Sequence, residues 1–151
     1  MLKEACVENF TNVPGVIERG AKRIELCDNL AVGGTTPSIG VIKITAEYCS
    51  DKDASIIVIL RPRGGDFVYS LMEKAIMMRD LEEITASHAN GIAVGALTAV
   101  NDLDKPFLEE IAQAAQTETR KHFGNSVYMF TPIYIANYCE NYCIYCGFNC
   151  H

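Results

Sequence analysis

The sequence predicts an α/β protein: a truncated TIM-type barrel of about four βα units plus a fifth strand, which one chain cannot close. Two observations lead to this prediction. Short runs of β-branched residues alternate with stretches of helical spacing, which is typical of parallel strands joined by right-handed crossovers. The chain has 151 residues, whereas a closed eight-stranded barrel needs about 250.

The expected strands are short and rich in aliphatic residues; they comprise residues 2–8, 23–28, 55–60, 91–97 and 126–136. Between them we expect helices at residues 13–19, 38–49, 71–87 and 105–123. Turn and cap residues agree with this order, because Gly20 follows the first helix, Thr36-Pro37 is typical of a helix start, and Asp104 precedes the last helix. An open half-barrel leaves two sheet edges unpaired, so we expect self-association through these edges. A small flavodoxin-like open sheet is the alternative fold.

Composition and charge exclude several classes of protein. With 49% hydrophobic and 21% charged residues, the chain is expected to be a soluble globular protein. Its formal net charge of −6 argues against a nucleic-acid backbone as the main partner. The longest aliphatic run, residues 56–60, is too short to cross a membrane. Because the first residues lack the pattern of a signal peptide, we expect a cytoplasmic protein.

Two cysteines are expected near the carboxyl ends of the first two strands. Because side chains alternate along a strand, Cys6 and Glu8 share one face with Glu25 and Cys27. Barrels and open α/β sheets bind their ligands at this end of the sheet. Two soft thiolates in this position would suit Cu(I). The alternative is that both cysteines are small buried apolar residues, which is the interpretation we favour for Cys49.

The segment after the third strand contains Arg61, Arg63, Gly64 and Gly65. Alternation places both arginines on one face, and the glycines allow backbone N–H groups to approach an anion. The glycines at 33–34 open a helix and would favour negative charge in the same way. Together these features predict a pocket for a small anionic molecule. In the alternative interpretation, the arginines only neutralise glutamates inside the barrel, namely Glu8 and Glu25.

Five segments carry a family resemblance, at residues 6–9, 23–27, 33–38, 61–67 and 95–98. In this order they resemble the CutC family of copper-homeostasis proteins, and the resemblance covers residues 1–116. It implies a cytoplasmic barrel-type protein linked to copper handling, in which Cys6 and Cys27 match the family's proposed Cu(I) thiols. The sequence identifies no catalytic residue, so whether the protein is an enzyme stays open.

A second group of cysteines, Cys139, Cys143 and Cys146, follows the expected fifth strand with the spacing C-x3-C-x2-C. Three thiolates from one loop can ligate three irons of a 4Fe-4S cluster and leave the fourth iron open. With the flanking residues, this spacing resembles the 2-iminoacetate synthase (ThiH) branch of the radical S-adenosylmethionine superfamily, over residues 117–151. The resemblance implies a 4Fe-4S cluster, S-adenosylmethionine and cleavage of tyrosine for thiamine thiazole synthesis. A zinc site with Cys150 and His151, and unligated thiols, are the alternatives.

The two resemblances meet inside the expected helix 105–123, which gives two segments, 1–116 and 117–151. No flexible linker separates them, although natural fusions usually join at exposed flexible segments. We interpret the chain as the front of one barrel gene joined to the front of another. Copper homeostasis is therefore the leading functional hypothesis. A truncated radical enzyme and an inactive fusion fragment are the alternatives.

Overall fold

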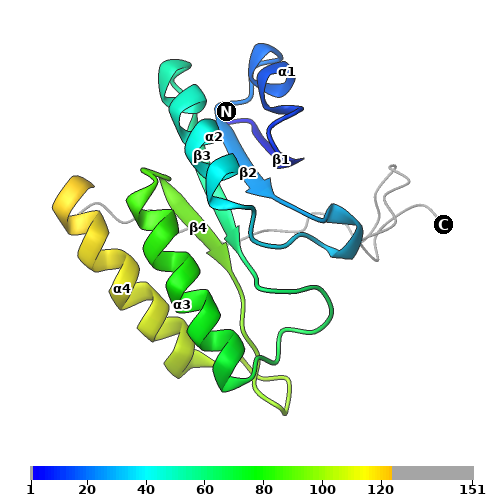
Figure 1. Ribbon diagram of the computed structural model, residues 1–151, viewed down its shortest axis with the longest axis vertical. Coiled ribbons are helices and arrows are strands. Elements are labelled where there is room, and N and C mark those ends of the chain that lie inside the picture. Colours follow the sequence, from blue (N-terminus) through cyan, green and yellow to red (C-terminus); the bar gives the residue numbers. More distant parts are fainter. Residues whose placement is uncertain (1, 124–151) are drawn as a thin grey trace.

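The computed structural model describes residues 2–123, which form a four-stranded parallel sheet with helices packed against one face (Figure 1). The strands are β1 (Glu4–Glu8), β2 (Arg23–Cys27), β3 (Ser55–Leu60) and β4 (Gly91–Val94). The helices are α1 (Val13–Glu18), the short 3-10 helix η1 (Leu30–Val32), α2 (Ile39–Asp51), α3 (Leu71–Ala86) and α4 (Lys105–Phe123). Among these helices, none combines the length and apolar character needed to span a membrane.

The order of the strands decides between the two predicted folds. Neighbouring strands follow chain order, β1-β2-β3-β4, and every pair is parallel. A flavodoxin-like sheet would place the first strand between the second and the third. The repeated βα arrangement with a parallel sheet is therefore confirmed, and it is consistent with a partial TIM-type barrel. The expected fifth strand, 126–136, lies outside the described residues. Self-association through the outer edges of β1 and β4 stays a prediction.

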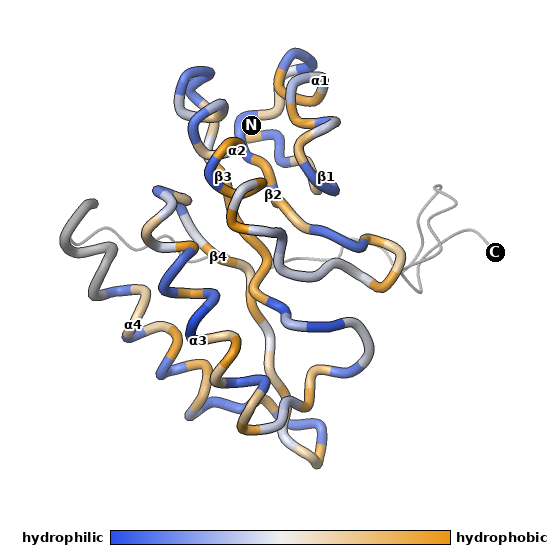
Figure 2. Tube along the Cα trace, in the orientation of Figure 1, coloured by the Kyte–Doolittle hydropathy of each residue, from blue (hydrophilic) through white to orange (hydrophobic). Residues whose placement is uncertain are grey.

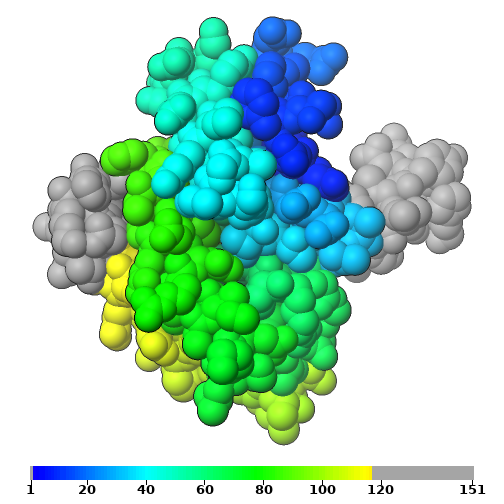
Figure 3. Space-filling model, viewed as in Figure 1, coloured from blue at the N-terminus to red at the C-terminus, as the bar shows by residue number. Residues whose placement is uncertain are grey.

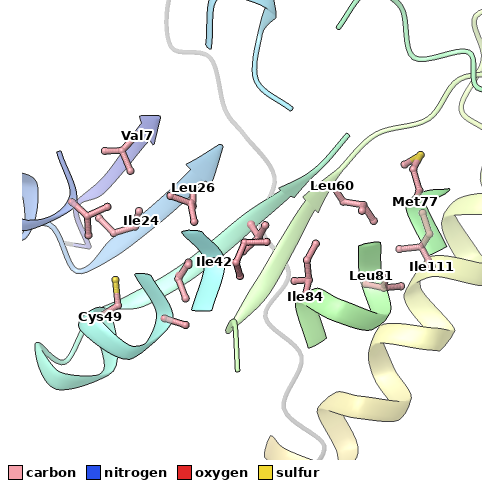
Figure 4. Packing of buried hydrophobic residues seen from close by; sticks show 14 of the residues in the cluster. Val7, Ile24, Leu26, Ile42, Cys49, Leu60, Met77, Leu81, Ile84 and Ile111 are labelled. Carbon is pink, nitrogen blue, oxygen red and sulfur yellow. The ribbon is translucent and has the colours of Figure 1, made fainter. Parts of the chain in front are cut away.

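The core lies between the sheet and the helices (Figure 4). One side chain in two along each strand faces this layer, and the register places Val7 beside Leu26 and Leu26 beside Val58. All three are almost fully buried. In Figure 2, β2 and β3 are hydrophobic along most of their length, and α2 and α3 cover much of the face seen in Figure 3. Burial of this aliphatic layer is the main stabilising contribution to the fold.

The opposite face of the sheet carries the residues of interest. One row across the four strands contains Cys6, Glu25, Ile57 and Gly91, which are neighbours in the register. The row is polar on β1 and β2 and apolar or small on β3 and β4. The polar side chains of this row thus lie on the first two strands.

Two helix starts differ from the sequence prediction. The N-cap of α2 is Ser38, whose hydroxyl accepts a hydrogen bond from the Val41 N–H. The Thr36 hydroxyl bonds the backbone of Arg61 instead, because a loop residue can pair with another loop that is distant in sequence. At α3 the sequence analysis missed a capping box in which Ser70 and Glu73 each bond the other's backbone N–H. The S-x-x-E spacing of Ser70 and Glu73 in the sequence is typical of a capping box and could have predicted it.

Candidate functional site

Cys6, in the middle of β1, and Cys27, at the carboxyl end of β2, lie together, and their Sγ atoms are 3.8 Å apart. The register pairs Cys6 with Glu25 and Glu8 with Cys27, so the two cysteines are diagonal neighbours. Strand spacing and rise then separate their Cα atoms by about 8 Å, which is too wide for a disulfide without backbone movement. Both thiols are free, and their sulfur atoms are close enough to face one ion.

The two thiols differ in accessibility. Cys6 is exposed and borders an open groove lined by residues that include Asn12 and Arg19. Cys27 is only 1% exposed, because the backbone at Gly34 packs against it: a Cβ atom at residue 34 would lie 3.3 Å from the Cys27 Cβ. An incoming ion would therefore meet Cys6 first.

Hydrogen bonding also distinguishes the two sulfurs. The Cys27 thiol is within 3.2 Å of the Val7 carbonyl oxygen, to which it donates. The pKa of Cys6 is lowered chiefly by its hydrogen bond with Cys27, whose single S–H proton can turn from the Val7 carbonyl to the Cys6 thiolate. The pKa of Cys27 is raised by its hydrogen bond with Cys6 and then by burial. Cys6 is thus the thiol that ionises first.

The surrounding donors restrict the kind of metal that fits. Within residues 2–123, no three side chains of the His, Cys, Asp and Glu types are grouped so that they could hold a metal ion. Structural zinc sites use four ligands, and calcium sites use six or more oxygens. Two thiolates with no third ligand suit Cu(I), which soft sulfur ligands select. Glu25 lies beside Cys6 in the register, but its carboxylate oxygens are hard donors, which Cu(I) does not favour. Burial, and then the charge of Glu4, raise the pKa of this carboxyl.

Arg61 follows β3 and is buried between two loops. Its Nη1 donates to the carbonyl oxygens of Val32 and Gly34, both at 3.0 Å, and its Nη2 donates to the Gly65 carbonyl at 2.6 Å. The ring of Phe67 stacks on the guanidinium, with 4.6 Å between the Arg61 Cζ and the ring centroid. These bonds run to backbone carbonyls rather than to the glutamates of β1 and β2.

Arg63 is also bonded within its own part of the chain. Its guanidinium pairs with Glu73 and with Asp66, the latter at 3.0 Å, and donates to the Val68 carbonyl. The N–H groups of residues 33 and 34 are bonded to the carbonyls of Leu30 and Asn29. Most of the donors proposed for an anion thus have partners in the protein, and an anion site with Arg61, Arg63, Gly64 and Gly65 stays a prediction.

The ion pair of Glu73 with Arg63 predicts a pH dependence of stability. The Arg63 guanidinium, followed by the bonds from Ser70, lowers the pKa of Glu73 from 4.5 to about 2. Since the folded pKa lies below the unfolded one, this stabilisation is present above pH 4.5 and is lost as the pH falls through 2. Urea unfolding should therefore show Glu73→Gln less stable than wild type at pH 7, with the gap closing towards pH 2. An unchanged gap at pH 2 would contradict this assignment.

Comparison with known proteins identifies the family of this chain. Residues 1–123 match the family model described as the CutC family. The chain belongs to the CutC family. This match extends beyond residue 116, where we placed the boundary between the two segments, to the end of α4, and α4 is a single helix across that position.

Several CutC relatives match about three quarters of this chain, with coverages from 74% to 79%. A family protein CutC from Enterococcus faecalis is 48% identical over 77% of this chain and 56% of its own length. One from Vibrio vulnificus is 38% identical over 79% of this chain and 48% of its own. The crystal structure of a protein from Streptococcus agalactiae, named "Putative Copper Homeostasis Protein CutC", has a TM-score of 0.73 and 42% identity, covering 77% of this chain and 55% of that one. The chain thus spans about half the length of the CutC proteins it matches.

The remaining cysteines fall into two groups. Cys49 is fully buried on α2, and burial raises the pKa of its thiol to about 11. It packs as a small apolar residue, as the sequence analysis favoured. Cys139, Cys143 and Cys146 lie outside the described residues. The resemblance to radical S-adenosylmethionine enzymes, with its 4Fe-4S cluster, gains no support from the CutC relatives above.

The sequence analysis missed the role of the glycines at 33–34. They were interpreted as donors to an anion, whereas in the structure Gly34 lies against Cys27 and Ile59. Gly34 has a φ of +86°, a conformation that glycine adopts without steric penalty. Two consecutive glycines soon after a strand that ends in a cysteine could have indicated that the backbone approaches this cysteine closely.

Proposed function

We propose that this CutC chain binds and handles Cu(I) in the cytoplasm, with Cys6 and Cys27 as the two thiolate ligands. The observation that carries the proposal is the 3.8 Å separation of their Sγ atoms. The name of the Streptococcus agalactiae relative supports it, since that protein is described in terms of copper homeostasis. A cytosolic setting is consistent with the proposal because thiols stay reduced there.

The asymmetry of the pair suggests the order of binding. Cys6 is exposed and has the lowered pKa, so its thiolate attacks the incoming Cu(I) complex and displaces a ligand of the carrier. Cys27 then loses its proton and becomes the second ligand. Because thiolates rather than thiols bind the metal, uptake releases protons and affinity falls as the pH falls.

A Cu(I) titration tests the two ligands. The experiment uses the full chain with the four C-terminal cysteines replaced by serine, so that Cys6, Cys27 and Cys49 remain. Competition with a chromophoric Cu(I) chelator, without oxygen, should show one tightly bound Cu(I) per chain. Cys6→Ser and Cys27→Ser should each weaken binding by at least about 100-fold, because even residues outside the ligand set typically change metal affinity by about 10- to 100-fold.

The control is Cys49→Ala, which removes the other buried thiol but leaves the Cys6–Cys27 pair intact and should preserve both affinity and stoichiometry. Circular dichroism checks that each variant is folded. Wild-type affinity in either Cys6→Ser or Cys27→Ser would overturn the proposal.

A further inference from the structure

The loop of residues 32–36, here called the cover loop, lies over the Cys27 thiol. A Cβ atom at Gly34 would be 3.8 Å from the Cys27 Sγ and 3.2 Å from the Cδ1 of Ile59. Backbone bonds between Asp28 and Thr35 close the base of the loop, with N to O distances of 2.9 and 2.7 Å. The thiol is 1% exposed. Access to Cys27 therefore depends on movement of the cover loop.

Arg61 is bonded to the cover loop from the neighbouring strand. Its Nη1 donates to the carbonyls of Val32 and Gly34, and its Nη2 holds Gly65 in the loop after β3. The backbone gives a second connection, because the Arg61 N–H donates to the Thr36 hydroxyl at 2.8 Å and the Thr36 N–H donates to the Arg61 carbonyl at 2.9 Å. One side chain thus joins two loops at the carboxyl end of the sheet.

We infer that Arg61 is a positioning residue that keeps the cover loop closed over Cys27. A planar guanidinium can bond carbonyls of both loops at once, whereas a lysine ammonium acts as a point charge. Phe67 covers the guanidinium, and Arg61 is only 6% exposed, so water does not readily replace these bonds. The consequence for Cu(I) release rests on the proposed function, but the consequence for thiol access does not.

Cysteine alkylation tests the closed loop without copper. The full chain carries Cys6→Ser and serine in place of the four C-terminal cysteines, so that Cys27 and Cys49 are the two remaining thiols. Their alkylation by iodoacetamide is followed separately by peptide mass spectrometry. With Arg61→Met, the cover loop loses its guanidinium bonds, and Cys27 should react about tenfold faster or more.

Cys49 distinguishes local opening from general unfolding. It is fully buried in α2, so a variant that merely destabilises the fold accelerates both thiols together. Arg61→Lys is the second variant, because it keeps the charge and the aliphatic stem but cannot bond both loops; it should also accelerate Cys27 alone. Arg63→Met is the matched control, since the side-chain hydrogen bonds of Arg63 run to residues 64–73, and it should leave the Cys27 rate unchanged.

The copper measurement restores Cys6 and follows transfer of Cu(I) to a chelator after rapid mixing. Arg61→Met should release Cu(I) about tenfold faster than Arg63→Met. Faster Cys27 alkylation in a protein that binds no Cu(I) would support the role of Arg61 and overturn the proposed function. An unchanged Cys27 rate in Arg61→Met, or equal acceleration of Cys27 and Cys49, would overturn the inference about Arg61.

Discussion

Leu26→Ala is expected to lower the free energy of unfolding by about 3 kcal/mol, within the range of about 2 to 5 typical of buried leucines. Leu26 is fully buried in β2, where the register places it between Val7 and Val58. Strands on both sides and the helix layer surround the site, so the backbone cannot collapse into the space left by the side chain. The loss therefore includes both burial of apolar surface and the residual cavity.

Leu71→Ala is the matched control, because Leu71 is 87% exposed at the start of α3. Its effect should stay within about 0.5 kcal/mol. Urea unfolding followed by circular dichroism measures both variants under the same conditions. Equal effects in the two variants would show that the sheet does not bury Leu26 as described.

Gly34→Ala is expected to destabilise the protein by about 2 to 5 kcal/mol. Its φ of +86° imposes strain of about 1 to 2 kcal/mol on a residue with a side chain. The new methyl group would also lie 3.2 Å from Ile59 Cδ1 and 3.3 Å from Cys27 Cβ, and crowding of this kind typically contributes about 1 to 3 kcal/mol. The same substitution should expose Cys27, because the cover loop has to move away from it.

Gly40→Ala serves as the control for Gly34→Ala. Residue 40 lies in α2, and a Cβ atom there would meet nothing within 4 Å. Alanine in place of a helical glycine stabilises by up to about 1 kcal/mol, so the two substitutions should act in opposite directions. Thermal unfolding and Cys27 alkylation distinguish them. A stable Gly34→Ala protein with a protected Cys27 would contradict the tight packing of the cover loop.

The thiol pair and the cover loop give the two cysteines different roles. Cys6 faces an open groove, whereas Cys27 lies under the cover loop that follows β2. In the proposed function, this arrangement places capture of Cu(I) at Cys6 and retention at Cys27. Two of the proposed experiments separate these roles, because Cys6→Ser removes the first ligand and Arg61→Met loosens the cover over the second.

The sequence by itself determined the order of strands and helices over the four βα units, and which side chains share a face of the first two strands. The alternating direction of side chains along a strand predicts that Cys6, Glu25 and Cys27 share one face, because this direction follows from local geometry. The four βα units were predicted from the alternation of β-branched runs with stretches of helical spacing, which is also a local pattern. Family membership over residues 1–123 agrees with the resemblance carried by short sequence segments.

Only the tertiary structure decided which residues contact one another around this face of the sheet. Three of the partners of Arg61 lie 25 to 29 positions earlier in the chain, at Val32, Gly34 and Thr36, and no local pattern specifies such contacts. The same holds for the diagonal offset that brings the two Sγ atoms to 3.8 Å. Local periodicity fixes which way a side chain points, whereas loop packing and strand register, which depend on the whole fold, fix what it meets.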